Sequence, residues 1–357
     1  MGLLGPQDIT RGAALPLNET RQILALEDDH LEELIKKWIA RLIENGREYV
    51  GFDRPTASAD QGRDSVGFLT SHRYDGPWDN YQAKQLKKPL SPADFFSELG
   101  KVFYYAAEER YTLPRRYIFV APNSAQGSVL KLIDRPSSIG PALLENWDTQ
   151  CKYKIKKSGA PLTPDIRKLI SGYSFENVEL WKCSTIIEQP HMRGVMVEQL
   201  DLDPGAAPTL KESDIPSTPG EDEIAYISQL VGVYAFHRGS DFTDQNAAMN
   251  DPEYGPKLTR ARRQFLERKA FRLHFRDNLD AALLDQVDTD VFDGVYDHYC
   301  SHEDGELYKR LLGVMERAAS VEVTGPLGKH RRVTPSVKQG SCHHYACEGS
   351  QPLKWDR

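Results

Sequence analysis

The sequence predicts a protein of two parts, an α/β N-terminal domain built on a mixed sheet and a mainly α-helical C-terminal domain. Three observations support this prediction. The first segments follow the order α-β-β-β-α-β, a proline-rich acidic stretch interrupts the pattern, and helical periodicity dominates after it. The chain has 357 residues, more than one average domain. We expect a loose leader at 1–22, the α/β domain at 23–200, an exposed linker at 201–223 and the helical domain at 224–357.

The first helix is predicted over residues 27–44. Apolar residues recur there at helical spacing between Leu31 and Leu42, and charged residues occupy the opposite face. Asp28 or Asp29 is expected to cap its first turn. Short extended segments follow, at 49–52, 64–69 and 80–86.

The second helix is predicted to begin after Ser91. Serine is a favoured N-cap, and Pro92 and Asp94 suit the first turn of a helix. An apolar strand is expected at 116–122, where proline ends it. More helix is expected over 140–200, with Trp147 and Trp181 as packing anchors.

The C-terminal part reads as a series of helices. The candidates are 223–236, 260–287 and 306–319. A hairpin is expected after them, with strands at 321–323 and 331–337 and a turn at 325–328. Phe265, Phe271, Phe275 and Leu279 are expected to pack in a core or an interface.

Charge and composition restrict the function. The formal net charge is −7, so any contact with DNA needs a local basic patch. No apolar run of about 18 residues is present, and the first residues lack the pattern of a signal peptide. The five cysteines are irregularly spaced. These features predict a cytoplasmic protein in a reducing compartment.

Polar residues with the chemistry of a hydrolytic site gather on the predicted strands. Gln82 and Lys84 lie two apart on the third strand and therefore share a face, and the neighbouring strand can bring Asp64 beside them. Glu32 on the first helix can complete the group. Asp64, Gln82, the carbonyl of Ala83 and Glu32 are the candidate oxygen ligands for a hard cation, while Lys84 can hold the attacking water or stabilise phosphate charge.

This pattern, from Glu32 through Asp64 to Gln82-Ala83-Lys84, resembles the PD-(D/E)xK restriction-endonuclease-like fold in its Q-x-K variant. The wider string over roughly residues 25–150 is similar to the effector-nuclease domains of bacterial anti-phage systems. The resemblance implies an endodeoxyribonuclease that uses Mg²⁺ or Mn²⁺, with Asp64, Gln82, Lys84 and Glu32 as its site. Gln82 stands where an acid is commoner, and Glu33 is an alternative to Glu32 as the helix acid.

Basic residues around this core are candidates for contacts with the phosphate backbone of double-stranded DNA. An ordinary solvated surface explains them equally well. No base-reading motif is present, which predicts cutting with little sequence specificity. The candidates are Lys87, Lys88, Lys101, Arg115 and Arg116.

The end of the chain combines cysteine and histidine, in Cys342, His343, His344 and Cys347. His298, Cys300 and His302 lie upstream. Zinc needs four ligands in a tetrahedral arrangement, and these spacings match no common zinc module. Packing and capping by Cys342 and His343 is the favoured interpretation, with a zinc-dependent regulatory module as an alternative.

Two strings in the C-terminal part, Arg262–Asp277 and Gly340–Trp355, are similar to the C-terminal domain of the effectors (LmuA) of Lamassu-type ABC-three-component defence systems. Tyr345 and Cys347 depart from the usual tail of that family. The resemblance implies docking onto an SMC-like ABC ATPase and a small middle subunit, and a nuclease that is activated by release and homo-oligomerisation. We expect the docking contacts at Phe265, Phe271, Phe275 and Trp355. The alternative function is a non-catalytic assembly subunit with a degenerate nuclease fold.

Overall fold

The structure is a computed structural model that describes residues 19–55, 60–276, 278–302, 305–348 and 353–356. The chain divides into two compact units after Leu200. Most of the predicted leader, residues 1–18, lies outside the described ranges. Residues 19–24 are helical and Ile23 is fully buried, so the loose segment does not extend to residue 22. Within these ranges, every helix is too short or too polar to span a lipid bilayer.

The N-terminal unit is built on a five-stranded mixed sheet in the order β1-β2-β3-β4-β5. The first three strands pair antiparallel, whereas β3, β4 and β5 pair parallel. The predicted order α-β-β-β-α-β is therefore present. The strands are β1 (Gly51–Asp53), β2 (Ser65–Phe68), β3 (Trp78–Ala83), β4 (Arg116–Val120) and β5 (Val178–Trp181).

The last strand was not predicted, because residues 140–200 were expected to be helical. Trp181 is buried as expected, but it lies on β5 and not on a helix. A strand of four residues is specified mainly by the neighbour that it pairs with, here β4, and that neighbour is distant in sequence. Trp147 is also buried, and its indole Nε1 donates a hydrogen bond to the carbonyl of Ala160.

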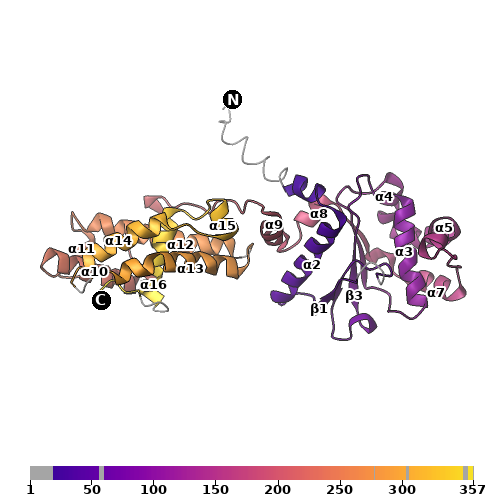
Figure 1. Ribbon diagram of the computed structural model, residues 1–357, viewed down its shortest axis with the longest axis horizontal. Coiled ribbons are helices and arrows are strands. Elements are labelled where there is room, and N and C mark those ends of the chain that lie inside the picture. The colour runs from indigo at the N-terminus through magenta and orange to yellow at the C-terminus, as the bar shows by residue number, and fades with distance from the viewer. Residues whose placement is uncertain (1–18, 56–59, 277, 303–304, 349–352, 357) are drawn as a thin grey trace, which may run out of the picture. The chain divides into compact units, whose positions relative to one another are not determined.

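Helices cover both faces of the sheet (Figure 1). On one face lies α2 (Asp28–Glu44), whose Trp38 packs edge-on against Tyr81 of β3. On the other face lies α3 (Pro92–Ala107), whose Phe95 packs against Phe119 of β4 at 4.9 Å between ring centroids. The remaining helices of this unit are α4 (Gly127–Ile133), α5 (Ile139–Asn146), α6 (Lys152–Ile155), α7 (Pro164–Gly172), α8 (Cys183–Ile187) and α9 (Met192–Leu200).

The helix starts agree only partly with the sequence. Ser91 caps α3 by accepting a hydrogen bond from the backbone N–H of Asp94, as predicted. At α2 the predicted aspartate cap is wrong, because Glu27 occupies the N-cap position and makes no side-chain cap. Asp28 instead accepts a hydrogen bond from the backbone N–H of Gln85, at 2.6 Å. That contact ties the start of α2 to the segment after β3.

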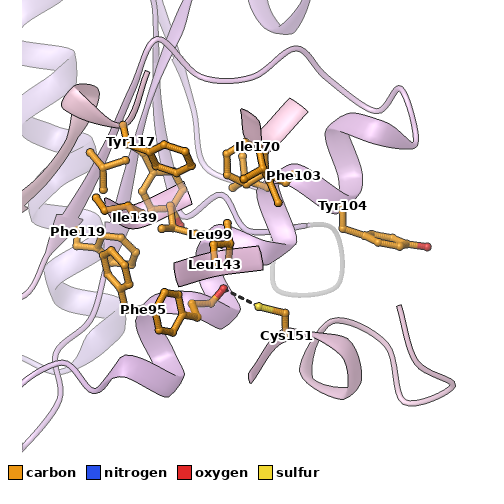
Figure 2. Packing of buried hydrophobic residues seen from close by; sticks show 14 of the residues in the cluster. Phe95, Leu99, Phe103, Tyr104, Tyr117, Phe119, Ile139, Leu143, Cys151 and Ile170 are labelled. Atoms are coloured by element: carbon orange, nitrogen blue, oxygen red, sulfur yellow. Dashed lines mark hydrogen bonds between the residues drawn. The ribbon is translucent and has the colours of Figure 1, made fainter. Parts of the chain in front are cut away.

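A large hydrophobic core of the N-terminal unit fills the space between α3 and the sheet. Figure 2 shows Phe95, Leu99 and Phe103 of α3 beside Tyr117 and Phe119 of β4. All five side chains are almost completely buried. Burial of large aromatic side chains is a major contribution to domain stability. This packing fixes α3 against the strands that carry the candidate site.

The described residues of the C-terminal unit form helices joined by loops, and none of them forms a strand. The predicted helix at 260–287 is two helices, because Asp280 starts the second one by accepting a hydrogen bond from the backbone N–H of Ala282. Its helices are α10 (Ile224–Arg238), α11 (Gln245–Met249), α12 (Gly255–Phe275), α13 (Ala281–Cys300), α14 (Leu307–Ser320), α15 (Gly325–Lys329) and α16 (Pro335–Glu348).

The predicted hairpin at 321–337 is wrong. The proposed turn at 325–328 belongs to α15, and the second predicted strand runs into α16. Proline suits the first turn of a helix, and Pro326 and Pro335 both stand there. Helix α16 then packs against α10, α12, α13 and α14.

Residues 201–223 lie on the C-terminal unit. Leu202 is fully buried, and Asp203 forms an ion pair with Arg332. At the other end Glu223 pairs with the buried guanidinium of Arg262, at 2.9 Å. The acidity that suggested an exposed linker is thus partly used in ion pairs with this unit.

Candidate active site

Asp64 and Gln82 meet in a buried contact. Ser65 pairs with Tyr81 across β2 and β3, so Asp64 lies opposite Gln82 just before the start of β2. The amide Nε2 of Gln82 donates a hydrogen bond to Oδ2 of Asp64, at 2.5 Å. Their exposed fractions are 8% for Asp64 and 1% for Gln82. The predicted juxtaposition of these two side chains is present.

The amide of Gln82 is held at both ends. Its Oε1 accepts a hydrogen bond of 3.2 Å from the hydroxyl of Tyr117 on β4. Burial raises the pKa of Tyr117 well above its usual range, so this hydroxyl keeps its proton and remains a donor. Tyr117 was not predicted as a site residue.

Lys84 lies immediately after β3 and not within it, which corrects the predicted extent of that strand. Its backbone N–H donates a hydrogen bond to the carbonyl of Val120, so the parallel pairing continues one step past Ala83. Lys84 and Gln82 therefore share a face, as predicted. The ammonium of Lys84 lies 3.2 Å from Oε1 of Glu98 on α3.

Burial and charge alter the protonation of these groups. Burial raises the pKa of Asp64 to about 7, the charge of Lys84 opposes this shift, and Glu32 and Glu98 add to it. Burial alone lowers the pKa of Lys84, but the carboxylates of Glu98 and Asp64 outweigh it and raise that pKa. Lys84 is therefore a cation at neutral pH, and Asp64 is poised to gain or lose a proton there.

The predicted helix acid, Glu32, lies close enough to influence Asp64 but is itself paired. Its carboxylate accepts hydrogen bonds from Arg54 at 2.8 and 3.1 Å. Its backbone carbonyl accepts a hydrogen bond from the hydroxyl of Ser65. The adjacent acid, Glu33, pairs with Arg54 and with Lys36.

Glu98 was missed in the sequence, although a signal for it exists. It lies on α3 one turn after Phe95 and one turn before Val102, on the face that the helix buries. A carboxylate at such a position needs a charged or hydrogen-bonding partner. Its partners are Lys84 and Lys101.

The donors at this site suit a hard divalent cation. Asp64 offers a carboxylate, Gln82 an amide oxygen and Ala83 a backbone carbonyl, and Mg²⁺ commonly takes one or two carboxylates with other oxygens. Among the described residues, no three His, Cys, Asp or Glu side chains form a metal-binding group, so the fit depends on the amide and carbonyl oxygens. The Gln82 amide would have to rotate by half a turn to face its oxygen towards Asp64.

The predicted DNA-contacting residues separate into two groups. Lys87 and Lys88 are exposed, as a phosphate contact requires. Lys101 pairs with Glu98 at 2.9 Å. For Arg115 and Arg116 the predicted contact with the phosphate backbone is corrected, because carboxylates already neutralise their charge.

The partners of these two arginines are close. Arg115 lies 2.5 Å from the fully buried Asp79 and 2.6 Å from Glu48, and Arg116 lies 2.9 Å from Glu179. An arginine whose fork is occupied by carboxylates has few donors left for phosphate. Both residues therefore form ion pairs at the starts of β3, β4 and β5.

The predicted docking residues of the C-terminal unit are core residues. Phe265, Phe271, Phe275 and Trp355 are between 0% and 3% exposed. Their side chains cannot contact a partner without unfolding of the unit. Their burial argues for packing positions, and their predicted role as partner contacts stays a prediction.

The cysteines and histidines of the tail lie on α16. Cys342 and His343 are buried, and burial lowers the pKa of His343 to about 3. His343 is therefore neutral at physiological pH, and its ring packs against Tyr226 and Trp355. Both residues occupy packing positions.

Comparison with known proteins finds one relationship. Residues 223–355 match the model of CTD6, C-terminal domain 6 of the ABC-three component (ABC-3C) systems. No curated protein and no solved structure matches the chain. The match covers most of the helical C-terminal unit, which is therefore similar to the C-terminal domain of ABC-3C systems.

Proposed function

We propose that the N-terminal unit is a metal-dependent DNA endonuclease and that the chain is the effector subunit of a bacterial anti-phage complex of the Lamassu type. The observation that carries the proposal is the buried contact of Asp64 with Gln82, with the cationic Lys84 on the same face. The strand order and the CTD6 match support it.

Asp64, Gln82 and Ala83 would hold Mg²⁺ or Mn²⁺, which when bound neutralises phosphate charge and activates water. Asp64 loses its proton on taking up a cation, since the proton and the metal compete for one carboxylate. Tyr117 holds the Gln82 amide through its Oε1 in the metal-free site. After the half-turn that metal binding requires, the hydroxyl oxygen of Tyr117 would accept a hydrogen bond from Nε2 of Gln82. Lys84 donates hydrogen bonds to a phosphate oxygen or to the attacking water, and its charge stabilises the transition state.

Contacts with DNA fall to residues whose charge is free to meet phosphate. Lys87 and Lys88 follow directly after the site and are exposed. Contacts of lysine with the backbone carry no sequence information, which agrees with cutting of low specificity. A net charge of −7 weakens binding by a single chain. We infer that ATPase partners hold the chain silent and that release and oligomerisation activate it.

A second candidate is a non-catalytic subunit that bridges partners. The pairing of Glu32 with Arg54 favours it, because a nuclease that needs this helix acid would have to break a two-bond ion pair. The two proposals predict different outcomes for DNA cleavage. The purified chain, alone and with its partner subunits, is incubated with plasmid and phage DNA and Mg²⁺. Cutting that is lost with Lys84→Ala supports the nuclease, and absence of cutting in every mixture supports the bridging subunit.

A further inference from the structure

The geometry points to Glu98 as a positioning residue that holds the ammonium of Lys84 beside, but apart from, the Asp64–Gln82 contact. This inference rests on the proposed function, because it assigns Glu98 a role in the same site. Glu98 lies on α3, whereas Asp64, Gln82 and Lys84 belong to the sheet and its ends.

Glu98 is held between two lysines. Its Oε1 lies 3.2 Å from the ammonium of Lys84, and its Oε2 lies 2.9 Å from that of Lys101. The side chain of Glu98 is 10% exposed, and those of the two lysines are 21% and 24% exposed. With both oxygens engaged, the carboxylate has one orientation, and Lys84 is fixed by a charged partner with little freedom to turn.

The placement of Glu98 is coupled to that of Asp64 through the packing of α3. Gly62 lies in the turn before Asp64 and has a φ of +87°, a conformation that favours glycine. A Cβ at this position would lie 2.9 Å from the Cβ of Lys101 and 3.4 Å from a methyl group of Val102. The turn that carries Asp64 thus rests on the same helical turns that carry Glu98.

Without Glu98, the ammonium of Lys84 would occupy a different position. Asp64 is the other carboxylate whose charge acts on Lys84. A flexible lysine released from Glu98 would pair with Asp64 and compete with a cation for its oxygens. Glu98 therefore keeps Asp64 available and Lys84 aimed at the position of the phosphate.

The test is a double-mutant cycle on the complete chain, with Glu98→Gln, Lys84→Ala and the double variant. Glu98→Gln is expected to lower kcat for plasmid cleavage by about 10- to 100-fold while KM for DNA stays within about twofold, as for other residues that orient an active-site group. In the Lys84→Ala background it should have no further effect. Glu98→Asp should restore part of the rate. Glu108→Gln, on the exposed end of the same helix, is the matched control and should cut like the wild type.

Two further measurements do not depend on cleavage. Mn²⁺ binding, followed by EPR of the free ion, should weaken severalfold in Glu98→Gln, because the released ammonium of Lys84 competes with the cation for Asp64, and should be lost in Asp64→Asn. Urea unfolding of the same cycle without metal should show coupling between Lys84→Ala and Glu98→Gln. Additive effects on unfolding, or Mn²⁺ binding in Glu98→Gln as tight as in the wild type, would overturn the inference. If the wild type cuts no DNA, the proposed function is wrong, and the unfolding cycle alone decides whether Glu98 holds Lys84.

Discussion

The side-chain amide of Gln82 donates a hydrogen bond to the carboxylate of Asp64, at 2.5 Å, inside the N-terminal unit. The contact joins the start of β2 to the end of β3. Its immediate consequence is electrostatic, because a carboxylate that is 8% exposed resists ionisation. Four predictions concern this site and the helical C-terminal unit.

Replacement of Asp64 by asparagine should stabilise the metal-free protein at high pH. The folded-state pKa of Asp64 is about 7, above the unfolded value of 3.8, so the folded protein binds the extra proton between these values. The free energy of unfolding therefore falls as pH rises from about 4 to about 7, by roughly 4 kcal/mol at most for this group.

An asparagine side chain at this position needs no such proton, so Asp64→Asn should gain about 1–3 kcal/mol over the wild type at pH 8 and little at pH 4.5. Urea unfolding at the two pH values measures the difference. The same gap at both values would mean that Asp64 is ionised without penalty in the folded state.

A divalent cation should stabilise the wild type at pH 8 relative to Asp64→Asn. Mn²⁺ or Mg²⁺ that binds the folded state and not the unfolded state raises the free energy of unfolding by mass action, by about 2.7 kcal/mol at a concentration of 100 Kd. The wild type should therefore gain thermal stability with Mn²⁺ at pH 8, and EDTA should remove the gain. Asp64→Asn serves as the control and should show no shift. An equal shift in both proteins would place the cation elsewhere.

Loss of the ammonium of Lys84 should cost catalysis far more than folding. Lys84→Ala is expected to lower cleavage by about 100-fold or more, in line with loss of one electrostatic donor. Lys87→Ala, an exposed neighbour, is the matched control and should change mainly the salt dependence of DNA binding. Rates of plasmid nicking under single-turnover conditions provide the comparison. Similar rates for the two variants would contradict the assignment of Lys84.

The aromatic residues of the C-terminal unit should behave as core residues. Phe271→Ala should lower the free energy of unfolding of this unit by about 3–5 kcal/mol, because the side chain is 2% exposed. Phe236→Ala, at 59% exposure, should change it little. Denaturation monitored by near-UV circular dichroism compares them. A stable Phe271→Ala protein that merely loses its partners would restore the docking role that the burial argues against.

Much of the N-terminal fold follows from local signals in the sequence. Ser91 and Pro92 mark the start of α3, and the spacing from Leu31 to Leu42 marks α2. The proximity of Asp64 and Gln82 followed from strand alternation and from the pairing of neighbouring strands. Such features depend on residues close together in the chain or on one pairing of neighbouring strands.

The features that escaped prediction depend on distant partners. Strand β5 exists through its pairing with β4, and Glu98 matters because α3 brings it to Lys84. In the sequence, Arg115 and Arg116 have the pattern of a basic patch. Their carboxylate partners, Asp79 and Glu179, are distant in sequence and could not be foreseen from it. The prediction of a hairpin at 321–337 was wrong for a different reason, since glycine and proline begin helices as readily as they form turns.

Asp64 is proposed to serve a metal-dependent cut in DNA, and plasmid cleavage tests this role. Supercoiled plasmid is incubated with wild type and Asp64→Asn, prepared identically and fractionated by size, with Mn²⁺ and with EDTA. We expect that oligomeric wild type linearises the plasmid with Mn²⁺ only, that its monomeric fraction is far less active per mole, and that Asp64→Asn is inactive although folded. Cleavage by Asp64→Asn at the wild-type rate, or cleavage that persists in EDTA, would contradict it.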